Sequence, residues 1–184
     1  MKPPVISHLL LSLLLCAGCK KEKTPLETLP PATQTGQNRA GCLIDGQAWQ
    51  PAYVSSTSSG NPFFVSWRRR PSGYALTLTM MRITNSQNMR LVFWVPNIRR
   101  AGTFALDQTA DPRITSANPP YGQFIDYEPF PGRDYLTGPA AAGTLTITRF
   151  DTVARIVSGT FELTPQTDDG QTVRLTDGRF DVTF

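Results

Sequence analysis

The cysteine at position 19 stands in a setting in which a thiol serves to attach lipid. Residues 13–19 close an N-terminal apolar run and place Cys19 directly after two small residues. The run from 5 to 15 has about the length of a signal-peptide core and is well short of the roughly 20 residues that a membrane-spanning helix needs. The pattern is typical of a bacterial lipoprotein signal. It predicts that residues 1–18 are removed as a signal peptide and that Cys19 carries the lipid.

Lipid on Cys19 determines where the chain is expected in the cell. Two acyl chains on a glycerol and a third, such as palmitate, on the amine would hold the chain firmly, because one chain alone binds a membrane only marginally. Residue 20 is Lys, whereas Asp at this position retains enteric lipoproteins in the inner membrane. By analogy we expect the outer membrane. The absence of an acidic run after Cys19 favours the periplasmic side, with exposure at the cell surface as the alternative.

Two other interpretations of the N-terminus stay open. The first is an uncleaved N-terminal anchor. The second is cleavage by the general signal peptidase, which the small residues Cys16 and Gly18 permit. The lipobox usually begins with Leu, Val or Ile three residues before the cysteine, and here that residue is Cys16.

Few side chains are available for catalysis once the signal is removed. The single histidine, His8, lies in the signal, so the mature chain has no imidazole for a metal ion or a Ser-His-Asp set. Cys42 is then the only free thiol, which excludes an intrachain disulfide, and its alternation with Ile44 predicts a buried small side chain. Residues 168–170 do not match the spaced ligands of a calcium loop and are interpreted as a turn. We therefore expect no metal and no cofactor.

The aromatic-rich segment 119–135 is the candidate binding surface. Its aromatic residues are Tyr121, Phe124, Tyr127, Phe130 and Tyr135. Prolines restrict pairing in a sheet, so part of the segment is expected as loop or edge. Exposed rings could stack on sugars or apolar ligands, and the alternative is that the rings seal an end of the β core. The same segment holds the carboxylates that glycoside hydrolysis would need, Asp126, Glu128 and Asp134.

Two further short motifs are candidates for surface chemistry. Three arginines at 68–70 follow Trp67 and lead into a turn at 71–73. They could contact phosphates or acidic sugars, or they could form a solvated hairpin tip. Asp151-Thr152-Val153 resembles a short O-glycosylation signal of exported proteins in some Gram-negative bacteria, which makes Thr152 a candidate modification site.

The formal net charge of +4 is unevenly distributed along the chain. All lysines lie at or before Lys23, whereas residues 40–184 hold 13 Arg and 12 Asp or Glu. A domain this close to neutral lacks the electrostatic footprint of nucleic-acid binding. The segment 19–39 is rich in Pro, Thr, Gln and charge and predicts a flexible tether with a span of roughly 25 Å. Its lysines can meet anionic lipid headgroups.

Residues 40–184 predict a single all-β domain. Apolar and polar residues alternate over 74–81, 89–95 and 144–148, and turn residues separate these runs. Such short, evenly punctuated strands indicate an antiparallel β-sandwich, with a β-barrel as the alternative. No window after residue 40 supports a long amphipathic helix.

Asp177-Gly178 predicts a two-residue hairpin turn near the C-terminus. This register pairs Arg174 with Asp181 on a solvated face. It places four apolar residues on the opposite face: Val173, Leu175, Phe180 and Val182. The rival interpretation is one bulged strand through Gly178.

The chain resembles a family of uncharacterised Gram-negative bacterial lipoproteins with an all-β domain. The likeness rests on the lipobox followed by Lys-Lys-Glu and on the motifs Ile44–Trp49, Gly143–Thr148, Ser158–Leu163 and Thr176–Val182. It covers most of the mature domain. The resemblance implies the fold and the compartment, and it implies no known activity or catalytic residues.

These patterns together predict a lipid-anchored protein of the cell envelope. We expect a non-enzymatic binding or structural module that meets the membrane through the lipid on Cys19 and binds a glycan or protein partner, but no nucleic acid. One alternative is a barrel that carries a small apolar ligand, which a pocket enclosed by inward aromatics would favour. The other is a carbohydrate-active enzyme using carboxylates, which two facing carboxylates in an open cleft would favour.

Overall fold

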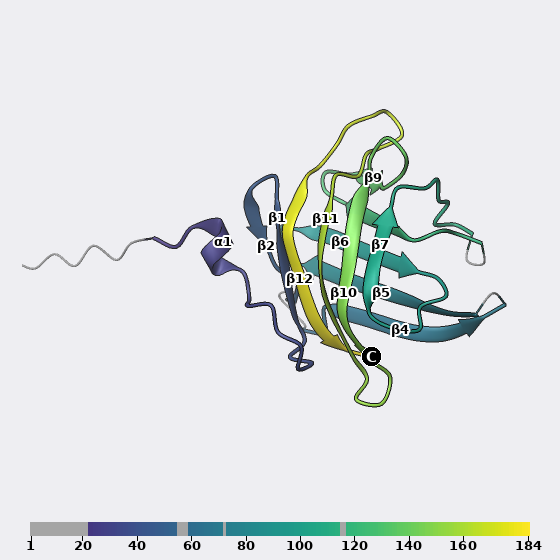
Figure 1. Ribbon diagram of the computed structural model, residues 1–184. Helices are drawn as coiled ribbons and strands as arrows, with labels where there is room; N and C mark the ends of the chain where they lie inside the picture. The colour runs from purple at the N-terminus through teal and green to yellow at the C-terminus, as the bar shows by residue number, and fades with distance from the viewer. Residues whose placement is uncertain (1–21, 55–58, 72, 115–116) are drawn as a thin grey trace, which may run out of the picture.

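Two β-sheets packed face to face form the structure, a computed structural model that describes residues 22–54, 59–71, 73–114 and 117–184 (Figure 1). The predicted β-sandwich is confirmed. The alternative of a closed barrel is wrong, because the two sheets keep separate edges and do not join into one ring of strands. The predicted signal peptide and Cys19 lie outside the described residues. Within the described ranges, no helix has the length and apolar character needed to cross a membrane.

The first sheet contains strands from both ends of the domain. Its strands are β1 (Arg39–Ile44), β2 (Gln47–Trp49), β7 (Gly102–Leu106), β10 (Gly143–Asp151), β11 (Ile156–Leu163) and β12 (Leu175–Thr183). They lie in the order β2–β1–β12–β11–β10–β7, and every neighbouring pair is antiparallel. The C-terminal strand β12 is therefore central, with β1 on one side and β11 on the other.

The second sheet is built mainly from the middle of the chain. Its strands are β3 (Ala52–Tyr53), β4 (Phe63–Arg70), β5 (Gly73–Ile83), β6 (Asn88–Val95), β8 (Tyr121–Asp126) and β9 (Arg133–Leu136). The order is β3–β5–β6–β8–β9, and β4 also pairs with β5. The short β3 runs parallel to β5, whereas the other pairs are antiparallel. Among the described residues the one helix is the single turn α1 (Pro25–Thr28), which precedes both sheets.

Apolar side chains from both sheets fill the space between them. On β5 the alternation predicted from the sequence turns Leu76, Leu78 and Met80 inward, where each is at most 1% exposed. Phe93 of the second sheet meets Phe161 of the first, with ring centroids 4.9 Å apart. Burying one such side chain completely stabilises the fold by roughly 1.5–3 kcal/mol. The alternative of a barrel that carries a small apolar ligand fails in its fold, because the two sheets do not close.

The C-terminal segment forms one strand instead of the predicted hairpin. Strand β12 continues through Asp177 and Gly178 without turning back, so the hairpin prediction is wrong and the rival interpretation of a bulged strand is confirmed. The register against β1 and β11 shifts here, and Asp177 takes up the extra residue with a φ of 53°. Gly178 lies against the Phe161 ring, where an added Cβ would come within 2.4 Å. Pairing on both sides outweighs the local turn preference of Asp-Gly.

The predicted ion pair between Arg174 and Asp181 is also wrong. Arg174 is exposed, and its backbone N–H donates to the Asp45 carboxylate at 2.9 Å. Asp181 is only 1% exposed, although it lies on the outer face of the first sheet. The predicted apolar face is confirmed, because all four of its members are buried: Val173, Leu175, Phe180 and Val182.

Candidate functional site

Asp181 is buried because residues 33–38, called the strap below, lie over it on the outer face of the first sheet (Figure 1). Two hydroxyls and three backbone N–H groups donate to its carboxylate at 2.6–3.2 Å. The donors are the Thr33 and Ser158 hydroxyls and the N–H groups of Thr35, Gly36 and Gln37. Both carboxylate oxygens therefore have partners.

These hydrogen bonds control the ionisation of Asp181. Burial on its own raises the pKa of a carboxyl group, but hydrogen bonds from Thr33, Ser158 and the strap backbone hold the pKa of Asp181 well below its usual value. The group therefore stays charged at neutral pH. Charge-assisted hydrogen bonds of this kind are roughly twice as strong as neutral ones.

The N-terminal segment contacts the domain on both sides of these bonds. Asn38 Oδ1 accepts hydrogen bonds from the Thr183 N–H and hydroxyl at 2.9 and 3.1 Å. Before the strap, the Thr28 carbonyl accepts from the Gln50 amide at 2.8 Å, and Leu29 is 8% exposed. The segment 19–39, expected as a flexible tether, is thus attached to the domain from Thr28 onward.

The five aromatic residues of the predicted binding surface do not form one exposed platform. Phe124 and Tyr135 belong to the main core, with ring centroids 5.9 Å apart. Tyr121 is 7% exposed and packs in a small cluster on the outer face of the second sheet. Tyr127 is half-buried under the Arg90 guanidinium, 5.5 Å from its ring centre, and only Phe130 is largely exposed, at 91%. The alternative that the rings seal the core is confirmed for Phe124 and Tyr135.

A polar cavity of about 320 Å³ opens beside Tyr121. It is lined by Asp111, Gln123, Asp134 and Asp168, among other residues. The Gln123 side chain is buried, and its Nε2 donates to both Asp134 oxygens at 2.8 Å. Burial, together with the negative charges of Asp111 and Asp134, raises the pKa of Tyr121. The cavity can accept hydrogen bonds from a hydroxyl-rich ligand.

The three carboxylates proposed for glycoside hydrolysis are not brought together. Asp134 lines the polar cavity, whereas Asp126 accepts a hydrogen bond from the Glu128 N–H at 3.1 Å in the connection after β8. The other carboxylates that line the cavity with Asp134 are those of Asp111 and Asp168, which come from connections far away in the sequence. Hydrogen bonds from the Arg113 side chain and backbone lower the pKa of Asp111, so Asp111 is suited to remain an anion rather than to donate a proton.

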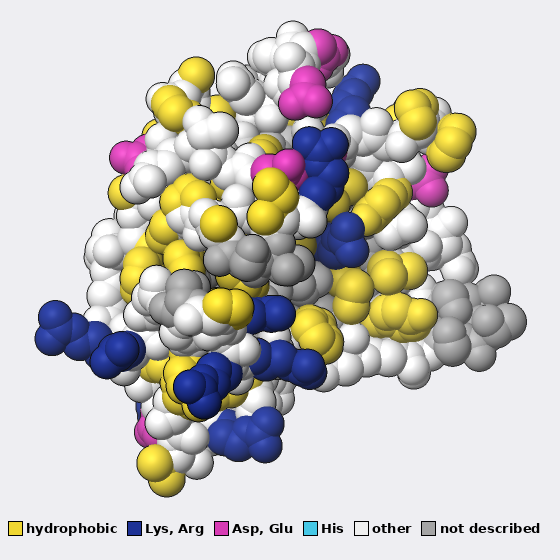
Figure 2. Space-filling model, turned by 90° about the vertical axis from the view of Figure 1, so that its right-hand side faces the viewer, with side chains coloured by type: hydrophobic (Ala, Val, Ile, Leu, Met, Phe, Trp, Pro, Cys, Tyr) yellow, Lys and Arg dark blue, Asp and Glu magenta, His cyan; other side chains and the backbone are white. Residues whose placement is uncertain are grey.

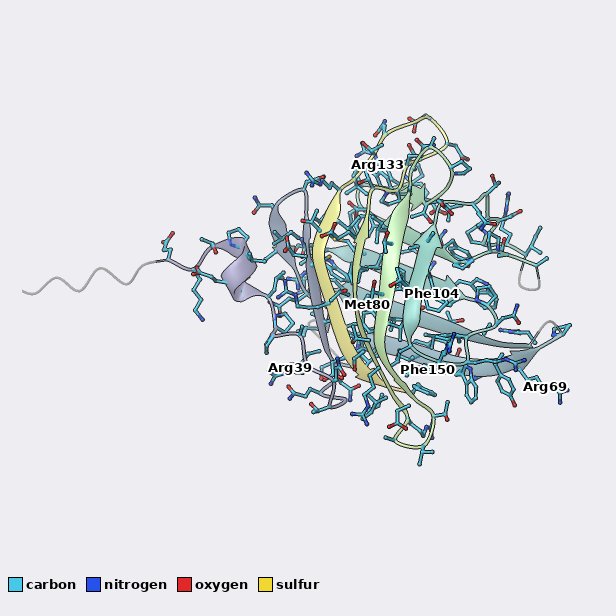
Figure 3. All side chains as sticks on the ribbon, in the orientation of Figure 1. Arg39, Arg69, Met80, Phe104, Arg133 and Phe150 are labelled. Atoms are coloured by element: carbon cyan, nitrogen blue, oxygen red, sulfur yellow. The ribbon has the colours of Figure 1, made fainter. Side chains whose placement is uncertain are left out.

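Five arginines lie at the end of the second sheet where β4 and β6 end, which is called the arginine end below. They are Arg68, Arg69, Arg70, Arg99 and Arg100. The first three end β4, and the last two follow β6. Leu76 pairs with Val95, so the chain before β5 and the chain after β6 continue side by side. They approach so closely that a Cβ added at Gly73 would come within 2.4 Å of Asn97 Oδ1. Figure 3 shows Arg69 at the far end of the molecule from α1.

Two other candidates from the sequence occupy contrasting positions. Cys42 is fully buried, and burial raises the pKa of its thiol to about 12, so the predicted buried side chain is confirmed. Thr152 is exposed in the turn between β10 and β11. That turn is stabilised by Asp151, whose carboxylate accepts hydrogen bonds from the N–H groups of Val153 and Ala154 at 3.0 and 2.8 Å.

Neither a metal site among the described residues nor a known relative indicates a function for this arrangement. Across the part of the chain that the structure describes, no group of three or more His, Cys, Asp or Glu side chains is placed to hold a metal ion. Comparisons with protein-family models, curated proteins and solved structures found no match.

Proposed function

We propose that the chain is a lipid-anchored protein of the outer membrane whose β-sandwich is a non-enzymatic binding module facing the periplasm. The signal pattern before Cys19 and the resemblance to bacterial lipoproteins support the anchor. The observation that carries the proposal is the strap, because it joins the N-terminal segment to a charged residue in a central strand. A chain fixed in this way restricts how the domain can turn on its anchor.

The contacts before the strap also shorten the distance between the domain and the lipid. Thr24 caps α1, and the chain contacts the domain from Thr28 onward. The segment from Cys19 to Thr24 extends at most roughly 18 Å, at up to 3.6 Å per residue. The bilayer therefore lies on the α1 side of the domain in this proposal, and the arginine end lies on the opposite side (Figure 1).

Cys19→Ala tests the anchor. We expect this variant to lose both palmitate labelling and retention in the membrane fraction, because Cys19 is the cysteine of the signal pattern that directly follows two small residues, Ala17 and Gly18. Cys42→Ala is the matched control, since it removes the other thiol of the mature chain and should retain both signals. Equal labelling and equal membrane retention of wild type and Cys19→Ala would overturn the proposal.

A second candidate function, carbohydrate hydrolysis, is favoured by one observation. Asp111, Asp134 and Asp168 line the same cavity, which supplies the neighbouring carboxylates that the reaction uses. Release of reducing ends from polysaccharides should then fall at least 100-fold in both Asp111→Asn and Asp134→Asn. Undetectable hydrolysis by the wild type across neutral and acidic polysaccharides would reject this candidate.

A further inference from the structure

Among the described residues, no acidic side chain forms an ion pair with an arginine of the arginine end. Residues 46–106, which include all of its members, contain seven arginines and no Asp or Glu. Within the described ranges, the ion pairs are Arg113–Asp111 and Arg149–Asp151, and both lie outside this stretch. Four members of the arginine end are exposed to solvent: Arg68, Arg69, Arg99 and Arg100. Their charges therefore add to a local positive potential that attracts anions.

The concentration of charge is visible on the surface. Figure 2 views the molecule from the right-hand side of Figure 1, the side on which the β4–β5 hairpin ends. Lys and Arg side chains occur in both halves of this face, whereas Asp and Glu lie mainly in the upper half, so the lower half is mainly basic. The domain as a whole is nearly neutral, so the positive charge is a property of one end and not of the molecule.

Aromatic rings lie beside the arginines and give this end a flat apolar component. Tyr74 is 43% exposed and stacks on Trp67, with ring centroids 4.3 Å apart and an angle of 25° between the planes. Arg69 is the strand partner of Tyr74 across the β4–β5 pair. The guanidinium of Arg70 lies 5.7 Å from the centre of the Trp94 ring, which restricts that side chain.

This combination matches a particular ligand chemistry. A guanidinium presents a planar fork of N–H donors that fits a carboxylate bidentately, and an exposed aromatic face accepts the apolar side of a sugar ring. Several such units placed side by side suit a polymer that repeats both features. We propose that the arginine end binds an acidic polysaccharide, one that carries a carboxylate on its sugar rings.

The location of the arginine end favours this ligand over an anionic lipid. In the proposed function, on which this inference rests, the lipid anchor holds the α1 side toward the bilayer. Figures 1 and 3 place the β4–β5 hairpin at the opposite end, where the same membrane is out of reach. A polymer in the space beyond the membrane can reach that end without competition from the headgroups.

Affinity electrophoresis of the full chain in detergent tests the proposal, with polygalacturonate as the probe and neutral dextran as the reference. We expect polygalacturonate to retard the wild type at about 50 mM salt and neutral dextran to leave its mobility unchanged. Arg69→Gln/Arg100→Gln should weaken binding at least 10-fold. The control Arg133→Gln/Arg174→Gln removes the same charge from exposed sites away from the arginine end and should change binding less than 3-fold. Retardation should fall as salt rises.

Three results would overturn the proposal. The first is the absence of retardation at low salt. The second is an equal loss in both double variants, which would show a response to net charge alone. The third is binding to vesicles with 20% phosphatidylglycerol that matches polygalacturonate binding in strength and in sensitivity to Arg69→Gln/Arg100→Gln, which would assign the surface to lipid.

Tyr74→Phe should keep the binding of wild type, because the ring face is retained, whereas Tyr74→Ala should weaken it about 3-fold or more.

Two variants separate this proposal from the lipid anchor. Cys19→Ala should leave polygalacturonate binding unchanged, and Arg69→Gln/Arg100→Gln should leave membrane retention unchanged. A wild type that carries no lipid and yet binds polygalacturonate would therefore refute only the proposed anchor and localisation.

Discussion

Asp181→Asn is expected to release the strap without altering the shape of the side chain. The amide keeps one acceptor oxygen and replaces the other with an NH₂ donor. In the better orientation the oxygen still accepts from the three strap groups that contact Oδ2, and the NH₂ meets the Ser158 hydroxyl and the Gly36 N–H. The hydroxyl can rotate to accept, whereas the Gly36 N–H is left facing another donor.

The magnitude follows from these bonds. A buried N–H without a partner costs about 1–3 kcal/mol, and the other hydrogen bonds lose the strength that the charge gave them. We expect a loss of about 3 kcal/mol in the free energy of unfolding, which lowers the thermal midpoint by roughly 6–12 °C for a domain of this size. Asp177→Asn is the control on the same strand, because Asp177 is exposed and its φ of 53° is tolerated by Asn. It should stay within about 0.5 kcal/mol of wild type.

The pH dependence gives the sign of the electrostatic contribution. The pKa of Asp181 is lower in the folded than in the unfolded chain, so its stabilisation is fully present above the unfolded pKa of about 3.9 and is lost as the pH falls toward the folded pKa. The difference between wild type and Asp181→Asn should therefore be constant above about pH 5 and shrink below about pH 4. Urea melts at several pH values measure this, and hydrogen exchange reports the Gly36 and Gln37 amides. Equal stability at pH 7 with unchanged exchange would refute the reasoning.

Three other expectations concern two buried residues and one exposed turn. Phe180→Ala should lower the free energy of unfolding by about 3–5 kcal/mol, because the ring is 2% exposed. Arg174→Ala, at an exposed site, should lower it by less than about 0.5 kcal/mol. Denaturant melts that give similar losses for the two variants would contradict this. Cys42 should react with a thiol reagent only when the domain unfolds, and rapid labelling of the native protein would show that the site is open. The hypothesis of glycosylation at Thr152 expects a glycan mass on protein from the native host that Thr152→Ala removes, and an unmodified intact mass would reject it.

The β core could be predicted from the sequence because its signal is local. Alternating residues on β5 assign Leu76, Leu78 and Met80 to one face whatever the neighbouring strands are, and all three are in the core. Asp177-Gly178 also carries a local signal, for a turn, but that signal is misleading because the chain continues there as strand β12. The strands that pair with β12, β1 and β11, come from distant parts of the chain, and no short sequence window contains them.

The candidate sites depended on contacts that the sequence does not display. Alternation correctly places Asp181 on the outer face, but its burial comes from the strap, whose polar composition is also that of a linker. Backbone N–H groups supply most of that contact, and they leave no trace in the residue types apart from Gly36, which has a φ of 73°. In the same way, Asp111 and Asp168 meet only because the fold brings their connections to one cavity.

The strap also determines how mechanical load enters the domain. A pull on the N-terminal segment first strains the packing of Leu29 and then the hydrogen bonds at Asp181 and Thr183. These two residues belong to β12, which has a hydrogen-bonded neighbour on each side, so the force is shared by two ladders. Force on an edge strand would instead open a single ladder one bond at a time. The N-terminal segment is therefore held at a strand that is paired on both sides.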